Sequence, residues 1–494
     1  MKKTYSFFIK FFVLAILCTT TFACSDDNDG KINGAGGIDV QPGMNVVGRI
    51  TDGTTPMEGV VVTDGYSVVA TDADGVYQIR ASRKAEFVYI SVPADCEIPM
   101  GSDGCPAHYQ PIKLQTNKVL YKDFTLKRTG VKKNFRLLAL ADVQIDTETH
   151  VTRLEKEMPK IVEYVKSLND QPVYGISLGD LGWDNMNIYP TYKKYVNQLN
   201  IPIFSVIGNH DHNQLMVDQD ADADAEFKEA FGPTYYSYNI GDCHFVVMDD
   251  VLYKNRKEYD ATLTTNQLNW LQKDLSYVDK NKLIIVGVHI PIERRNRNNQ
   301  LTNKDKLYEI LDGFNHVRVL SGHSHNNYTT THKEAPRIEE NTLGAVCGSL
   351  WYKETEICND GSPSGYAIYE IEGNTIKNWY YKGNSTPKDY QMILYKPGED
   401  KSGSYPNDVL VNIFTWHTNW KSVELYENGT LKQSLTKNIK VVDPTAYTAL
   451  DGDMTRIETN NDHMFKYTPT SSWSTIEVKA EDPYGNKYEG KITK

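Results

Sequence analysis

The order of apolar and polar residues divides the chain into a β-rich beginning, a middle region of alternating strands and helices, and a β-rich end. In the middle region, the mainly apolar runs 135–141, 173–178 and 201–207 alternate with stretches such as 150–168, where apolar residues recur at helical spacing. Periods of two and 3.6 residues distinguish strands from amphipathic helices. Their regular alternation predicts a layered α/β domain.

Strand signals dominate on both sides of this domain. From 44 to about 128, short strands are separated by Asp-Gly turns, which is typical of a small β sandwich. The letters GRITDG, GVVVTDG and TDADGVYQI there resemble an immunoglobulin-like or prealbumin-like fold. Helical signals fade after Tyr328, where 368–371 and 377–381 are predicted as strands that complete the α/β domain. A second β domain is expected from about residue 387.

The N-terminus has the features of an export signal. Two lysines precede the apolar run Phe7–Leu17, and Ala23 stands directly before Cys24. This arrangement resembles a bacterial lipoprotein signal peptide over 1–23, with Cys24 as the lipidated residue. The alternatives are a plain cleavable signal and a transmembrane anchor, for which the run is short. We expect a linker over 24–43 and a location in the cell envelope, on the periplasmic or surface face of the outer membrane.

Composition narrows the class of protein further. At 494 residues the chain is long enough for two or three domains. Its net charge of -11 argues against nucleic acid as a specific partner, which requires a basic surface. Since an exported protein can form disulfides, Cys96 with Cys105 and Cys347 with Cys358 are possible pairs, whereas Cys243 is expected to be a buried thiol. None of the cysteines has the paired spacing of a zinc-thiolate site.

Side chains that can bind metal ions or transfer protons follow five of the predicted strands. Ligands of open α/β sheets bind at the carboxyl ends of the strands, so we expect these side chains to converge. Each motif alone is a weak signal, but the five in this order are strong. They are Asp142-Val143-Gln144, Gly179-Asp180, Asn209-His210-Asp211, His289, and Gly322-His323-Ser324-His325.

This set of residue types suits a hydrolytic centre with two metal ions. Carboxylate and amide oxygens bind hard divalent cations, and imidazoles extend the choice to Mn, Fe or Zn as well as Mg. Asp180, a short carboxylate after glycine, is the candidate bridge between two ions that activate water. The leaving oxygen needs a proton, which His210 can supply with Asp211 orienting its ring.

The letters DVQ, GD, GNHD, VHIP and GHSH resemble the motifs of the calcineurin-like metallophosphoesterase superfamily over residues 134–330. The resemblance implies a two-sheet αββα sandwich, with His210 as the general acid. Gln144 stands where histidine is usual, and its amide oxygen is a harder and weaker ligand than imidazole. The implied ligands are Asp142, Gln144, Asp180 and His325 for one metal ion, and Asp180, Asn209, His289 and His323 for the other.

Two further segments bear on substrate recognition and domain organisation. Arg294 and Arg295 follow His289, and arginines bind phosphate oxygens bidentately, although a solvated loop explains them equally well. Asp249 and Asp250 end a strand and either face the site or form a turn. The letters GSLWYKETEICNDGSPSGYAIYEIEGN resemble the start of a C-terminal extension found in exported bacterial members, which we place at 331–494.

We therefore expect an enzyme of the cell envelope that hydrolyses phosphate esters with two divalent metal ions. Its substrate would be a phosphorylated small molecule or an envelope component. One alternative keeps the fold and changes the substrate to a phosphodiester or nucleotide, because pocket walls rather than metal ligands select substrates. The other is a non-catalytic surface lipoprotein that binds glycans or protein partners. The sequence does not determine the oligomeric state.

Overall fold

The computed structural model describes residues 37–215, 220–255, 258–293 and 300–494. The predicted signal peptide with Cys24, most of the predicted linker, and Arg294 with Arg295 lie outside these ranges. Among the helices in the described ranges, none is both long and apolar enough to cross a membrane.

The first β domain contains two sheets whose buried side chains pack in one cluster. Val46, Ile50 and Tyr77 of one sheet are buried with Val62 and Val88 of the other. In one sheet, β1 (Val46–Asp52) pairs with β2 (Thr55–Pro56), β5 (Val76–Ile79), β8 (Leu120–Tyr121) and β9 (Phe124–Leu126). The other has the order β4 (Val68–Ala70), β3 (Val61–Thr63), β6 (Phe87–Ile90), β7 (Tyr109–Pro111).

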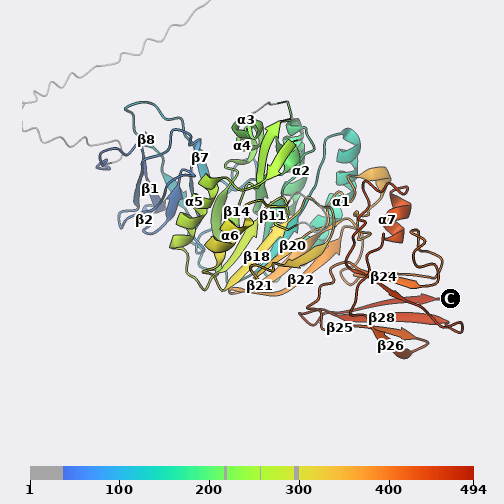
Figure 1. Ribbon diagram of the computed structural model, residues 1–494. Coiled ribbons are helices and arrows are strands. Elements are labelled where there is room, and N and C mark those ends of the chain that lie inside the picture. Colours follow the sequence, from blue (N-terminus) through green and yellow to red (C-terminus); the bar gives the residue numbers. More distant parts are fainter. Residues whose placement is uncertain (1–36, 216–219, 256–257, 294–299) are drawn as a thin grey trace, which may run out of the picture. The chain divides into compact units, whose positions relative to one another are not determined.

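Two mixed sheets form the centre of the α/β region (Figure 1). The first has the order β12 (Ile203–Val206), β11 (Val173–Leu178), β10 (Asn134–Leu140), β21 (Gly365–Glu372), β22 (Thr375–Gly383). The second has the order β13 (Tyr236–Ile240), β14 (Cys243–Val247), β17 (Leu283–Gly287), β18 (His316–Ser321), β20 (Ile338–Thr342), β19 (Tyr328–Thr331). Strands β10, β11 and β12 run parallel, as do β14, β17, β18 and β20.

Helices cover the outer face of each sheet, which confirms the predicted αββα sandwich. Leu138 and Leu140 of β10 pack outward with Leu154 and Met158 of α1 (Glu148–Ser167), while Leu137 points into the core between the sheets. The same outer layer contains α2 (Tyr189–Val196) and α4 (Ala225–Phe231). The layer over the second sheet contains α5 (Thr265–Asp274) and α6 (Lys304–Leu311).

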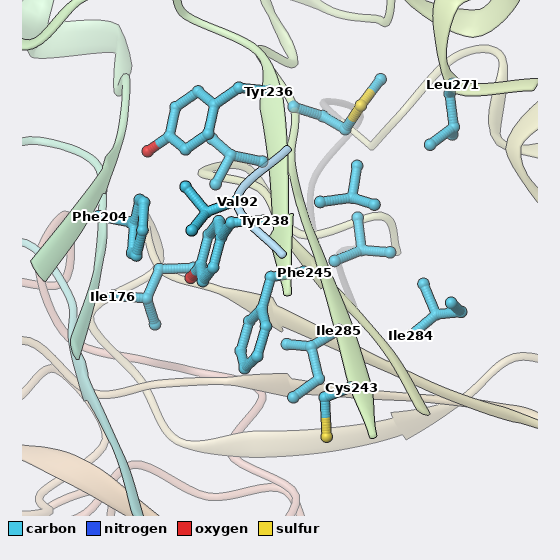
Figure 2. Packing of buried hydrophobic residues seen from close by; sticks show 14 of the residues in the cluster. Val92, Ile176, Phe204, Tyr236, Tyr238, Cys243, Phe245, Leu271, Ile284 and Ile285 are labelled. Carbon is cyan, nitrogen blue, oxygen red and sulfur yellow. The ribbon is translucent and has the colours of Figure 1, made fainter. Parts of the chain in front are cut away.

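Stacked aromatic rings fill part of the space between the two sheets. Figure 2 shows Phe204, Tyr238 and Phe245 lying face to face. Their centroids are 3.5 Å apart for Phe204 and Tyr238, and 4.7 Å apart for Tyr238 and Phe245. Val92 of the first β domain forms a backbone bridge with Tyr238, and its carbonyl accepts the amide of Asn239 at 3.0 Å. The first β domain thus covers β13, a strand at the edge of its sheet.

The last β domain follows the α/β region. Its first sheet has the order β23 (Met392–Tyr395), β24 (Val409–Ile413), β27 (Met464–Tyr467). Its second has the order β26 (Thr430–Ser434), β25 (Ser422–Glu427), β28 (Thr475–Glu481), β29 (Lys487–Thr493). Between β26 and β27 lies the short helix α7 (Pro444–Ala449), and the segment after it supplies Glu458, which accepts the amide group of Asn326 at 2.8 Å. The last domain therefore contacts the loop that carries His323 and His325.

The structure contains none of the disulfides that the sequence allowed, and Cys96, Cys105, Cys347 and Cys358 are free thiols. Their sulfur atoms have other neighbours. The thiol of Cys347 lies 3.7 Å from the amide oxygen of Gln144, whereas that of Cys358 lies 3.7 Å from the Tyr381 hydroxyl. Cys243 is a buried thiol, as predicted.

The stacked rings give a test of the core. Phe204→Ala is expected to lower the free energy of unfolding by about 3–5 kcal/mol, because it removes a buried ring and leaves a cavity between the sheets. Urea unfolding followed by tryptophan fluorescence measures this change. Leu431→Ala, at a residue that is 50% exposed, is the control and should change stability by less than about 0.5 kcal/mol. Equal effects of the two substitutions would contradict this packing.

Candidate metal centre

The buried carboxylate of Asp180 lies at the centre of the predicted ligands. Its Oδ1 is 3.2 Å from Nε2 of His289 and accepts the backbone amide of His210 at 2.9 Å. Its Oδ2 accepts a hydrogen bond from Nε2 of Gln144 at 2.6 Å. The two oxygens of Asp180 therefore face two different groups of side chains, as a bridging carboxylate requires.

Asn209, His289 and His323 form the first group. The Nε2 atom of His289 is 3.0 Å from Oδ1 of Asn209 and 3.2 Å from Nδ1 of His323. The other ring nitrogen of His289 contacts the carbonyl of Leu178 at 2.8 Å, which directs Nε2 toward the site. The ligand atoms of Asp180, His289 and His323 lie within 4.8 Å of one another, which is close enough to hold a metal ion.

Asp142, Gln144 and His325 form the second group. Nε2 of His325 is 3.5 Å from Oδ1 of Asp142, and its Nδ1 contacts the carbonyl of Gly348 at 2.6 Å. The side chains of Asp142 and Gln144 are buried beside them. Together the two groups offer carboxylate oxygens, amide oxygens and imidazole nitrogens, a donor set that fits hard or borderline divalent cations.

Backbone conformation aims these side chains at one another. Residues other than glycine rarely adopt a left-handed conformation, which costs about 1–2 kcal/mol, and such residues cluster at functional sites. Immediately after a strand, this conformation turns the chain over the edge of the sheet. Five predicted ligands have it, namely Asp142 (φ 51°), Gln144 (φ 43°), Asp180 (φ 51°), His323 (φ 66°) and His325 (φ 53°).

Close approach explains two glycines of the motifs. A Cβ atom on Gly208, which precedes Asn209, would lie 2.2 Å from the backbone nitrogen and Oδ1 of Asp180. A Cβ atom on Gly322 would lie 2.6 Å from Oδ2 of Asp142. Any larger residue would displace Asp180 at the first position and Asp142 at the second.

Two buried carboxylates that are not ligands hold the loops in place. Asp211 accepts the backbone amides of Leu181 at 3.0 Å and Gly208 at 2.9 Å, which joins the loop of Asp180 to that of Asn209. Asp250 accepts the backbone amide of His289 at 3.1 Å. Burial raises the pKa of Asp211 and of Asp250 to about 7.

Asp184, rather than the predicted Asp211, contacts the ring of His210. Nδ1 of His210 lies 2.7 Å from Oδ1 of Asp184, whereas the carboxylate of Asp211 is directed at backbone amides. Burial lowers the pKa of His210, but the charges of Asp180 and Asp184 outweigh burial and raise that pKa above its usual value. Sequence reasoning missed Asp184, although its place four residues after Asp180, in GDLGWD, was a usable signal.

Arg294 and Arg295 lie outside the described residues. The two aspartates after β14 and the nearby Trp351 have different positions relative to the site. Of the two aspartates after β14, Asp250 contacts the metal site and Asp249 lines a separate cavity. Trp351 is buried and donates its indole hydrogen to the carbonyl of Val143 at 2.9 Å, so it supports the ligand loop from behind.

Three family models match consecutive parts of the chain. They are the N terminal of calcineurin-like phosphoesterase over residues 44–129, calcineurin-like phosphoesterase over 135–327, and the C terminal of calcineurin-like phosphoesterase over 340–488. The fold and the centre define a metal-dependent hydrolase of phosphate esters. The chain belongs to the calcineurin-like phosphoesterases, a family that uses a dimetal centre.

Similar proteins include enzymes for both classes of phosphate ester. Human serine/threonine-protein phosphatase CPPED1 is 24% identical over 239 residues, which are 44% of this chain and 71% of that protein. A probable glycerophosphodiester phosphodiesterase, GpdQ of Arcobacter nitrofigilis, is 26% identical over 185 residues, 36% of this chain and 65% of that protein. A dimetal phosphatase from Danio rerio matches with a TM-score of 0.37 and 13% identity over 48% of this chain and 93% of that structure.

The contact between Asp184 and His210 predicts a change in pH dependence. Asp184→Asn removes a charge that favours the protonated ring, so the pKa of His210 should fall. The alkaline limb of the kcat profile should then move to lower pH by about 1 unit. Asp211→Asn should leave that limb in place and lower thermal stability instead, because it weakens the link between two loops. If the alkaline limb moved in Asp211→Asn and not in Asp184→Asn, Asp211 rather than Asp184 would orient the His210 ring.

Proposed function

We propose that the protein hydrolyses phosphate esters at a centre of two divalent metal ions and is held in the cell envelope by a lipid on Cys24. The observation that carries the proposal is the position of Asp180, whose two carboxylate oxygens face separate groups of ligands. A single shared carboxylate is the arrangement that holds two like-charged ions close together.

The proposed ligand sets are those implied by the motifs, with Asp180 shared between them. When bound, the metal ions act as Lewis acids toward the phosphate and increase the acidity of water. His289 would hold its ion through Nε2, because Nδ1 is held by the Leu178 carbonyl. Gln144 would hold the other ion through its amide oxygen, the one metal-binding atom of its side chain.

His210 supplies the proton that the leaving oxygen needs. Its ring is held by Asp184 at 2.7 Å and its backbone amide by Asp180 at 2.9 Å, so it stands beside the centre without being a ligand. The two carboxylates keep the imidazole protonated at higher pH than in water. Trp183 packs edge-on against the His210 ring, with centroids 5.8 Å apart, and restricts its movement.

Substrate and location rest on other observations. Similarity to a phosphatase and to a probable glycerophosphodiester phosphodiesterase supports a phosphate ester but leaves both ester classes open. Arg294 and Arg295, which follow His289 in the sequence, are the proposed contacts for the phosphate oxygens. The apolar run Phe7–Leu17 before Cys24 supports the lipid anchor.

Activity with and without metal ions tests the chemistry. The full-length protein in detergent should release p-nitrophenol from p-nitrophenyl phosphate or bis-p-nitrophenyl phosphate with Mn, Zn or Mg, and EDTA should abolish release. Asn209→Ala should lower kcat/KM by more than about 100-fold, because loss of a supporting contact to a ligand alone costs 10–100-fold. The preferred compound then separates a monoesterase from a diesterase.

Metal analysis of variants separates binding from catalysis. Asp180→Ala should lose both ions, whereas His210→Ala should retain them and lose turnover. His316→Ala, at an exposed histidine on β18, is the matched control and should retain both metal and turnover. Full activity in Asp180→Ala would refute the proposed centre.

The lipid anchor has its own test. In cells, Cys24→Ser should remove the protein from the membrane fraction and abolish labelling by a palmitate analogue. Ser25→Ala, one residue further on, should leave both unchanged. Labelling that persists in Cys24→Ser would rule out lipidation at this residue.

A further inference from the structure

A cavity of about 590 Å³ lies between the first β domain and the α/β region. Its walls come on one side from 64–66, 84–87 and Tyr89. On the other side they come from 220–221, Asp224, Lys228, 233–235, Asp249, Thr264 and 266–267. Such a volume suits a small organic molecule. None of the predicted metal ligands, all of which are among the described residues, lines this cavity.

Carboxyl groups outnumber ammonium groups around the cavity. Five carboxylates line it, those of Asp64, Glu86, Asp220, Asp224 and Asp249, against the two ammonium groups of Lys84 and Lys228. Lys228 is already engaged, at 2.9 Å from Asp224 and 3.2 Å from Glu86. Lys84 is exposed.

Asp249 is a buried carboxylate of the cavity wall that has no counter-ion among the described residues. The residue is 6% exposed, and its carboxylate accepts the backbone amide of Val251 at 3.2 Å. Among the described residues, no lysine, arginine or histidine forms an ion pair with it. Burial, together with the charges of Asp220 and Asp224, raises the pKa of Asp249 well above its usual range. A cation bound beside Asp249 would favour the ionised carboxylate and offset the cost of burying that charge.

Aromatic side chains form much of the remaining wall. Tyr66, Phe87, Tyr89 and Tyr235 line the cavity. The Tyr235 hydroxyl is held by the carbonyl of Gly65 at 2.9 Å and by the amide of Asn266 at 2.7 Å, so its ring is fixed before a ligand arrives. Aromatic faces attract ammonium groups with about 0.5–2 kcal/mol.

The spacing of the carboxylates argues against a metal ion. Among the described residues, the group of Asp180, His289 and His323 has ligand atoms within 4.8 Å of one another, and no group around this cavity does. The volume also greatly exceeds that of a metal ion. Carboxylates beside aromatic rings instead match an organic cation.

We propose that this cavity binds a small ammonium compound, whose charge lies against Asp249 and whose carbon atoms lie against the rings of Tyr66 and Tyr235. The site is separate from the metal centre and does not depend on the proposed function. The two sites are nevertheless linked through neighbouring residues. Asp249 of the cavity precedes Asp250, whose carboxylate accepts the backbone amide of His289 at 3.1 Å.

Isothermal titration of the full-length protein with choline, ethanolamine and 1,4-diaminobutane tests the site. At least one of them should bind with Kd below about 1 mM, whereas 3,3-dimethylbutan-1-ol, the uncharged analogue of choline, should not. Asp249→Asn should weaken binding at least tenfold. Glu229→Gln, at an exposed carboxylate of α4 outside the cavity wall, is the matched control and should bind as the wild type does.

Several outcomes would overturn the proposal. These are no binding of any of the three compounds, equal binding of the uncharged analogue, or unchanged binding in Asp249→Asn. Binding of Ca²⁺ that Asp249→Asn abolishes, without binding of an ammonium compound, would indicate a metal site instead. If Asp249→Asn does not fold, Tyr66→Leu decides, because this change should weaken choline binding and an undiminished affinity would refute the site.

Discussion

The burial of Asp180 is the constraint on which the metal centre depends. A carboxylate removed from water is costly unless cations or hydrogen-bond donors surround it. Here the imidazole of His289 and the amide of His210 meet one oxygen, and Gln144 meets the other. Divalent ions supply the same compensation more strongly, so metal binding and the stability of these loops are expected to be coupled.

The rest of the architecture brings backbone amides and ligands to this carboxylate. Parallel strands of two sheets end at the same edge of the sandwich, and left-handed residues turn the chain there. Buried carboxylates then hold the loops in place. Asp211 joins the loop of Asp180 to the loop of Asn209, and Asp250 holds the backbone of His289. The stacked rings between the two sheets fix the position of one sheet against the other, and with it the position of the strand ends.

The regular alternation of apolar runs allowed the sandwich to be predicted from the sequence. Strands with few apolar residues were not predicted. Strand β20 has the sequence Ile-Glu-Glu-Asn-Thr, which has little apolar character, yet Glu340 and Asn341 are fully buried. Glu340 accepts the hydroxyl of Ser321 and the amide of Ile292, and Asn341 donates to Thr329. Such burial depends on partners distant in sequence, so no local pattern announces it. The two disulfides that the sequence allowed are not formed, and the sequence could not show this for the same reason. The spacing of cysteines along the chain does not determine the direction of each thiol.

By itself, the sequence determined the class of fold and the order of the candidate ligands along the chain, because strand periodicity and polar residues at strand ends are local properties. It did not determine which carboxylate holds His210, since Asp184 and Asp211 are both close to the motifs and only folding directs one at the ring and the other at backbone amides. Tertiary structure also decided the two directions of Asp249 and Asp250. Asp249 lines a cavity, whereas the adjacent Asp250 accepts the backbone amide of His289.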